Sequence, residues 1–179
     1  MSAEIPRAAT GTGPTDSVVT GMTFPFPAER VWDRLLYYEE IEDPLPLPLR
    51  LLLPAPIRTE GRRSTVGDET RCRYRKGSLL KRVTGVALRR HWRFDVVEQD
   101  LPIAGGIRLK GGSYTLCELP DRSTRVELET RYVSRRRPRW MFGPLEAAIC
   151  HAFHRHILKA MRRESASPEL RDLETSSRA

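Results

Sequence analysis

The stretch "GGSYTLCELPDRSTRVELETRY", residues 111–132, decides the fold class of this chain. Every second residue from Val126 to Tyr132 is apolar or uncharged, and charged residues stand between them. This alternation predicts a β-strand with one face in a core and the other in water. Turn-forming residues separate it from an earlier strand pattern, in which Gly111 and Gly112 predict a bulge or sharp bend. The stretch therefore predicts neighbouring strands of an antiparallel sheet.

Four more segments have residues typical of strands. They are "SVVTGMTFPF" (17–26), "ETRCRYRKG" (69–77), "SLLKRVTGVA" (78–87) and "HWRFDVVEQ" (91–99). In the last segment, Trp92, Phe94 and Val96 alternate with more polar neighbours and are predicted to face inward. In this phase Arg82 and Arg93 point outward, and a slip of one residue would turn both into cavity cations.

Two helices and one irregular connector complete the pattern. "PAERVWDRLLYYEEIED" (27–43) predicts a first helix, with a proline near its start and an acidic first turn. The longest helical pattern runs from about Phe142 to Ser165, with Pro144 and Glu146 near its start. Its apolar stripe comprises Leu145, Ile149, Ala152, Phe153, Ile157 and Ala160.

The connector, "DPLPLPLRLLLPAPIR" (43–58), contains five prolines, which forbid a regular helix through most of it. We expect an extended or one-turn segment packed against the body, and a lid over a cavity is the alternative. Strands bracketed by helices predict an α+β fold, with the sheet wrapped around the last helix. The predicted organisation is a flexible leader (1–16), one domain (17–165) and a polar tail (166–179).

Composition and charge exclude several classes of protein. The 179 residues are 39% hydrophobic and 30% charged, and no apolar run reaches the length of a membrane helix. The N-terminus lacks the pattern of a secretory signal, so we expect a cytoplasmic protein. Three cysteines without a CxxC spacing predict small buried thiols rather than a zinc ribbon or redox pair.

The net charge of +8 raises the question of nucleic-acid binding. The basic residues, mostly arginine, are spread along the chain, and "SRRRPRW" (134–140) is their one dense cluster. We therefore expect solvated surface arginines rather than a nucleic-acid interface. A basic module that docks acidic partners through 134–140 remains an alternative.

Four segments together resemble a known superfamily. They are "FPFPAERVWDRL" (24–35), "VGDETRCRYRKG" (66–77), the opening stretch, and "HAFHRHILKAMRRES" (151–165). They are similar to the START-like, or SRPBCC, superfamily, which includes Bet v 1-like and polyketide cyclase/dehydrase proteins, and within it to an uncharacterised bacterial subgroup. The resemblance implies a helix-grip fold, in which a curved antiparallel sheet grips the C-terminal helix around a cavity for an apolar or aromatic small molecule. It supplies no universal catalytic residue, but similar members have a histidine pair at the places of His151 and His154.

Three of the four histidines lie on the predicted C-terminal helix. At about 100° per residue, His151 and His154 lie roughly 60° apart, and His156 lies roughly 140° or more from both. The three cannot share one ion, and no HExxH pattern is present, so we predict no metal site and no cofactor. His156 falls beside the apolar stripe, whereas the other two fall toward a wet or half-buried face.

The predicted function is binding of an apolar, lipid-like or polyketide-like molecule in an internal cavity. Predicted ligand-binding residues are Tyr74, Trp92, Phe94, Tyr114, Thr130, Tyr132, Phe153 and His156. The alternative is an aromatic polyketide cyclase or dehydratase that positions its substrate and uses acid–base catalysis. Its candidate catalytic residues are His156, Tyr132 and Tyr114.

Overall fold

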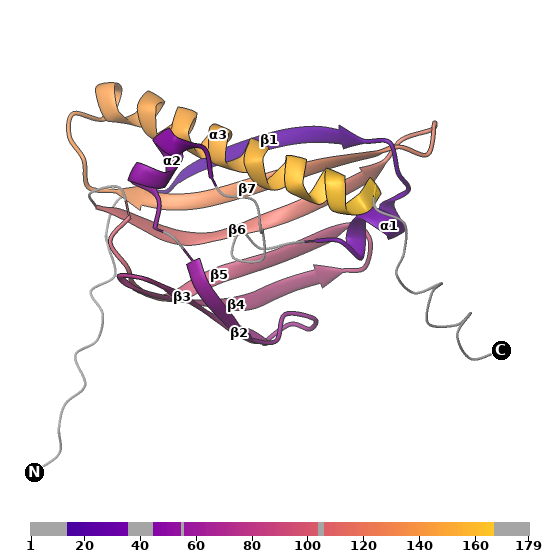
Figure 1. Ribbon diagram of the computed structural model, residues 1–179, viewed down its shortest axis with the longest axis horizontal. Helices are drawn as coiled ribbons and strands as arrows, with labels where there is room; N and C mark the ends of the chain where they lie inside the picture. The colour runs from indigo at the N-terminus through magenta and orange to yellow at the C-terminus, as the bar shows by residue number, and fades with distance from the viewer. Residues whose placement is uncertain (1–13, 36–44, 55, 104–105, 167–179) are drawn as a thin grey trace, which may run out of the picture.

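The computed structural model describes residues 14–35, 45–54, 56–103 and 106–166, and in these ranges it contains one seven-stranded antiparallel sheet and three helices (Figure 1). The elements are β1 Asp16–Phe24, α1 Ala28–Trp32, α2 Leu47–Leu52, β2 Pro56–Gly61, β3 Glu69–Tyr74, β4 Gly77–Ala87, β5 His91–Asp100, β6 Ile107–Glu118, β7 Thr124–Ser134 and α3 Arg139–Ala166. The strand order is β1-β7-β6-β5-β4-β3-β2. Most of the predicted leader and tail lies outside the described residues.

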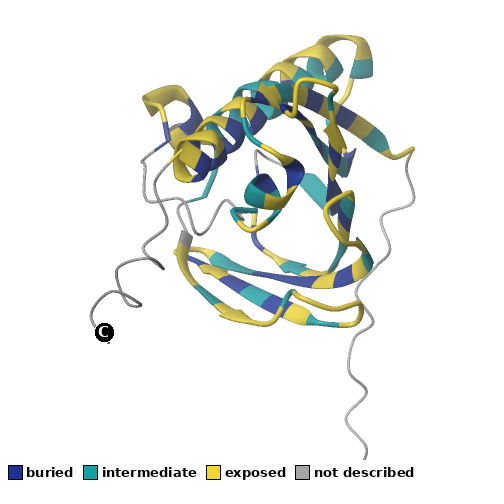
Figure 2. Ribbon diagram, turned by 90° about the vertical axis from the view of Figure 1, so that its right-hand side faces the viewer, coloured by how far each residue is buried: buried dark blue, intermediate teal, exposed yellow. Residues whose placement is uncertain are grey.

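The long helix α3 packs against the sheet at β1 and β7 (Figure 1). The remaining strands continue from this contact and curve around the helix (Figure 2). The predicted α+β helix-grip fold is confirmed. In this arrangement, the inward-facing residues of the middle strands point toward α3 across the interior of the fold.

The predicted strand phases are confirmed by burial (Figure 2). On β7, Val126 and Leu128 are buried, whereas Arg125 is exposed. On β5, Trp92 is buried, whereas Arg93 is exposed. Arg82 is also exposed and pairs with Glu69 across β3 and β4, 2.5 Å apart. The two arginines therefore stay outside the fold, so neither is a cavity cation.

The bulge predicted at the paired glycines is present. The register between β6 and β7 shifts between Leu109 and Gly111, whose φ is +154°. A side chain at Gly111 would collide with the backbone carbonyl oxygen of Phe94 on the neighbouring strand. Glycine is therefore required where β6 bends around the interior.

The first helix and the connector differ from prediction. α1 is only five residues long, ends at Trp32 and is followed by a turn. The Leu35 carbonyl then accepts a hydrogen bond from Arg63 (3.0 Å). The rest of the predicted helix, 36–43, lies outside the described residues. The connector forms the short helix α2, in agreement with the expected one-turn segment. It then continues into β2, which was not predicted because prolines at 54 and 56 are unfavourable in a strand. β2 is an edge strand, where a proline is tolerated.

α3 begins at Arg139, three residues before the predicted start. Arg139 donates to Asp16 on β1 (2.6 Å) and to Glu146 two turns along the helix (2.7 Å), and these bonds hold the first turn against the sheet. Pro144 consequently lies inside the helix rather than at its start.

Candidate ligand-binding site

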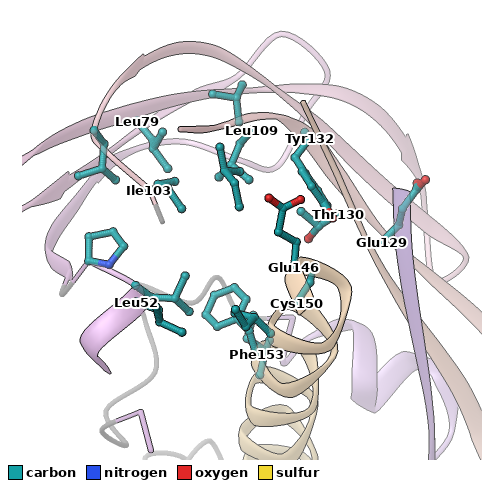
Figure 3. Close-up of a pocket in the computed structure, with 18 of the residues that line it drawn as sticks. Leu52, Leu79, Ile103, Leu109, Glu129, Thr130, Tyr132, Glu146, Cys150 and Phe153 are labelled. Atoms are coloured by element: carbon teal, nitrogen blue, oxygen red, sulfur yellow. The ribbon is translucent and has the colours of Figure 1, made fainter. Parts of the chain in front are cut away.

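A cavity of about 300 Å³ lies between the inner face of the sheet, α2 and α3 (Figure 3). Its apolar lining comes from α2 and the residues after it, from the middle strands and from α3. This lining includes Leu52, Leu53, Leu79, Val96, Leu101, Ile103, Ile107, Leu109, Leu128, Ile149, Phe153 and Ile157. Its volume is at the lower end of the range for small-molecule sites.

Polar groups gather on one side of the cavity, where β7 meets α3. Thr130 and Tyr132 come from β7, and Glu146 and Cys150 come from α3; Figure 3 shows the Glu146 carboxylate beside Tyr132. Burial, followed by the negative charge of Glu146, raises the pKa of Tyr132 to about 12. Tyr132 therefore stays a phenol near neutral pH and can donate a hydrogen bond to a ligand.

Glu146 is buried and both of its carboxylate oxygens are hydrogen-bonded. Ser134 at the end of β7 donates to Oε1 (2.7 Å), and Arg139 donates to Oε2 (2.7 Å). Arg139 also pairs with Asp16 at the start of β1. This cluster fixes the polar side of the cavity and joins α3 to both strands that it covers.

Lys81 is a cation on the inner face of the sheet. It lies between Leu79 and Val83 on β4, is 7% exposed and lines the cavity. Its Nζ lies 5.4 Å from the centre of the Phe94 ring, which also lines the cavity. The cavity wall therefore has a basic side chain on β4, and β5 and β6 separate it from the polar groups of β7.

A buried chain of hydrogen bonds runs beside the cavity. The Thr20 hydroxyl of β1 lies 2.8 Å from His151 Nδ1 and 2.9 Å from His154 Nδ1. On the other edge of the same ring, His154 Nε2 lies 2.8 Å from the Thr130 hydroxyl and 3.4 Å from Cys150 Sγ. Because Thr130 and Cys150 line the cavity, the chain connects the half-buried His151 to the cavity wall.

The hydrogen-bonding roles of the two histidine rings are linked through Thr20. A threonine hydroxyl has one proton, so it can donate to one Nδ1 and must accept an N–H from the other ring. Burial, followed by the charge of His151, lowers the pKa of His154 to about 4. His154 is therefore neutral near pH 7 and serves as a fixed hydrogen-bonding group inside the fold.

The predicted facing holds for His151, which is half-buried, but is wrong for His154. His154, placed by the sequence on a wet or half-buried face, is fully buried, and His156 is half-buried and lines neither this cavity nor the one described next. The reason is that α3 is covered on two sides. One side, through Ile157, faces the cavity, and the other, through His154 and Leu158, packs under the sheet.

The other predicted site residues are placed as follows. Six line the cavity: Tyr74, Phe94, Tyr114, Thr130, Tyr132 and Phe153. Trp92 lines a second, more polar cavity of about 260 Å³, which Tyr114 also borders. The Trp92 indole donates to the carbonyl of Arg63 (3.1 Å). Their contact with a ligand stays a prediction.

Sequence reasoning missed Lys81 and Glu146 as lining residues. The signal for Lys81 was available, since a strand that turns Arg82 outward must turn its neighbour inward. For Glu146 the signal was its spacing of four residues from Cys150 and seven from Phe153, which places the three on one helix face. Because an acidic residue near the start of a helix is usually explained by the helix dipole, Glu146 was not predicted to line the cavity.

The basic segment 134–140 is partly used by the fold itself. Arg139 belongs to the Glu146 cluster and Arg136 lines the cavity. No group of histidine, cysteine or acidic side chains that could hold a metal ion occurs among the described residues. In the same ranges, no helix is long and apolar enough to cross a membrane.

The three cysteines should react with iodoacetamide at very different rates. Cys117 is exposed, which corrects the expectation that every cysteine is buried, because its position in β6 faces outward. Cys72 is buried, and burial raises the pKa of the Cys150 thiol to about 11, which leaves little thiolate near pH 8. We expect Cys117 to be alkylated at least about tenfold faster than the others in the folded protein. Peptide mass spectrometry measures the order, and fast labelling of Cys150 would contradict its placement.

Comparison with known proteins supports the same fold. No family model and no curated protein matches the sequence. Among solved structures, a START superfamily protein from Mycobacterium smegmatis has a TM-score of 0.56 at 12% identity, over 84% of this chain and 97% of that one. The ZhuI aromatase/cyclase from a Streptomyces species has a TM-score of 0.55 at 17% identity, over 86% and 94%. The protein Ara h 8.0201 has a TM-score of 0.50 at 12% identity, over 87% and 100%.

The fold is therefore the helix-grip fold of the START-like, Bet v 1-like (SRPBCC) proteins. At these identities the likeness shows the fold, and the site must be interpreted from its own residues.

Proposed function

We propose that this protein binds an apolar small molecule, without transforming it, in the cavity between the sheet and α3. The observation that carries the proposal is the cavity itself, about 300 Å³ with a mostly apolar lining and a few polar groups placed at its sides. Replacing water by an apolar molecule on such a surface lowers the free energy of the system. The START-like fold, which is commonly a ligand-binding one, supports the same function.

Binding of the neutral fluorophore Prodan tests this proposal, and a cysteine pair supplies matched variants. Cys150→Trp places a large ring in the cavity, whereas Cys117→Trp places the same ring on the outer face of β6. We expect the fluorescence of Prodan to rise with the wild type and with Cys117→Trp, and binding to Cys150→Trp to be at least about tenfold weaker, since the ring fills the site. Circular dichroism checks that both variants are folded.

Two results would count against this function. If Prodan does not bind the wild type, the cavity does not take apolar molecules of that size. If Cys150→Trp binds as well as Cys117→Trp, the dye lies somewhere else.

A second candidate function is cyclisation or dehydration of a polyketide-like substrate. The observation that favours it is the phenol of Tyr132, which lies in the cavity beside Thr130 and a buried carboxylate and stays protonated. Such a phenol could donate a proton or hydrogen bond to a substrate carbonyl. Conversion of an aromatic polyketide analogue by the wild type but not by Tyr132→Phe would favour catalysis, and unchanged substrate would favour binding alone.

A further inference from the structure

We propose that the outward side of α3 and the basic segment before it dock on a membrane surface that contains anionic lipids. The inference goes beyond the proposed function, because it assigns a surface and a partner rather than a ligand of the cavity. It rests on an exposed apolar stripe of α3 and on the basic side chains that continue it.

The first half of α3 exposes apolar side chains to solvent. Trp140 is 79% exposed, Met141 47% and Leu145 52%. Pro144 and Ala148 are exposed as well. At about 100° per residue, the five positions fall within an arc of roughly 140°, so they form one exposed stripe on the side of α3 that faces away from the sheet (Figure 1). Single exposed apolar residues are ordinary, but a contiguous group marks an interaction surface.

The same side of α3 becomes basic in its second half. Arg155, Lys159 and Arg162 are exposed and fall within the same arc. Arg135 and Arg137, just before the helix, are exposed too. Among the described residues, no carboxylate forms an ion pair with any of these five side chains. Their positive charge is therefore available to an anionic partner.

An apolar stripe that continues into basic residues along one helix matches the surface of an anionic bilayer. The apolar side chains of such a helix enter the boundary between headgroups and acyl chains, while lysine and arginine contact the anionic headgroups. Tryptophan is enriched at this depth, because its ring is apolar and its N–H stays hydrated. Nucleic-acid phosphates would attract the basic residues but would leave Trp140 and Leu145 without a use. A membrane engages both halves of the helix.

The cavity opens beside this surface. Leu145 belongs to the exposed stripe and also lines the cavity, and Leu52 of α2 lines it while being 40% exposed. Arg136, between the two exposed arginines before α3, is another lining residue. Docking through the outward side of α3 would hold this opening close to the bilayer, where an apolar ligand could enter without crossing water. Only this last consequence rests on the proposed function.

Co-sedimentation with vesicles tests the docking. Vesicles of phosphatidylcholine alone are compared with vesicles that contain about one-third phosphatidylglycerol. We expect the wild type to bind the anionic vesicles at least about tenfold more tightly, and added salt to weaken this binding. Arg155→Gln/Lys159→Gln, which removes two charges, and Trp140→Ser, which removes the largest exposed ring, should each weaken binding to the anionic vesicles about tenfold or more.

Matched controls come from the end of the sheet opposite to the start of α3. Leu88→Ser removes a side chain that is 68% exposed in the turn between β4 and β5. Arg90→Gln/Arg122→Gln removes two exposed charges, from that turn and from the turn between β6 and β7. Both controls should bind vesicles as the wild type does. Circular dichroism checks that all variants are folded.

Other results contradict the inference. If vesicles without anionic lipid bind equally well, or if the α3 variants bind like the controls, this surface does not dock on anionic membranes. If no vesicle binds but a DNA duplex or polyglutamate does, the partner is a nucleic acid or an acidic protein and the inference is wrong. If no vesicle binds and sedimentation velocity shows a dimer that Trp140→Ser dissociates, a second copy of the chain covers the exposed stripe. Vesicle binding with the expected variant pattern but without Prodan binding would support the docking and contradict the proposed function.

Discussion

Acidification from about pH 6.5 to pH 4 is expected to lower the free energy of unfolding by about 3 kcal/mol through His154 alone. Burial holds the pKa of this histidine at about 4 in the folded protein, against an ordinary value of 6.5. Between these two values the unfolded chain binds a proton that the folded chain does not, so stability falls as the pH falls. Above pH 6.5 both states are neutral at this position, and well below pH 4 both are charged, so the loss is confined to the window between them.

Urea unfolding of the wild type and of His154→Gln across this pH range measures the effect. His154→Gln keeps groups that can bond Thr20 and Thr130 but cannot titrate, so its stability should change much less between pH 6.5 and 4.5. His156→Gln is the matched control on the same helix and should follow the wild type. Although burial alone would raise the pKa of Glu129, hydrogen bonds from Ser17 and Ser113 lower it from 4.5. Its contribution to stability is therefore lost as the pH falls below about 4.5, which is the lower limit of this comparison. A wild-type stability that is flat from pH 6.5 to 4.5 would contradict the burial of His154.

Glu146→Leu is expected to lower the free energy of unfolding by about 2–3 kcal/mol. Removing one partner of a buried ion pair costs about 3–5 kcal/mol, and the value is reduced here because the Arg139 side chain is 27% exposed and keeps its bond to Asp16. The Ser134 hydroxyl, which is buried, loses its acceptor as well.

Glu164→Leu supplies the control for this variant, because Glu164 is an exposed acid near the other end of the same helix and should change stability by no more than about 0.5 kcal/mol. Glu146→Gln, which keeps hydrogen-bonding groups but loses the charge, should lie between the two. Equal stabilities of the two leucine variants, measured by urea unfolding, would show that the Glu146 cluster does not hold α3 to the sheet.

The outer and inner faces of the strands were predictable because side-chain direction alternates along a strand whatever lies around it. This local rule placed Trp92, Phe94 and Tyr132 inward and Arg82 outward, and the paired glycines marked the bulge in β6. The length of α3 was predictable to within a few residues for the same reason, since its pattern repeats over several turns. The candidate cavity residues on strands follow from these rules.

The helix faces were not predictable, because burial of a helix depends on what covers it. The apolar stripe of α3 marks the side toward the cavity, but β1 and β7 also cover the side that carries His154. The ring is tolerated there because Thr20, 134 residues earlier in the sequence, and Thr130 bond its two nitrogens. No local pattern contains that information.

The sequence by itself thus determined the α+β class, the strand phases and the long C-terminal helix, all of which follow from the periodicity of neighbouring residues. Only the tertiary structure decided which polar groups are inside. Lys81, Glu146 and His154 are buried because the curved sheet brings partners or an apolar wall from distant segments around each of them. A polar side chain remains buried only where such partners meet it, and that depends on the whole fold.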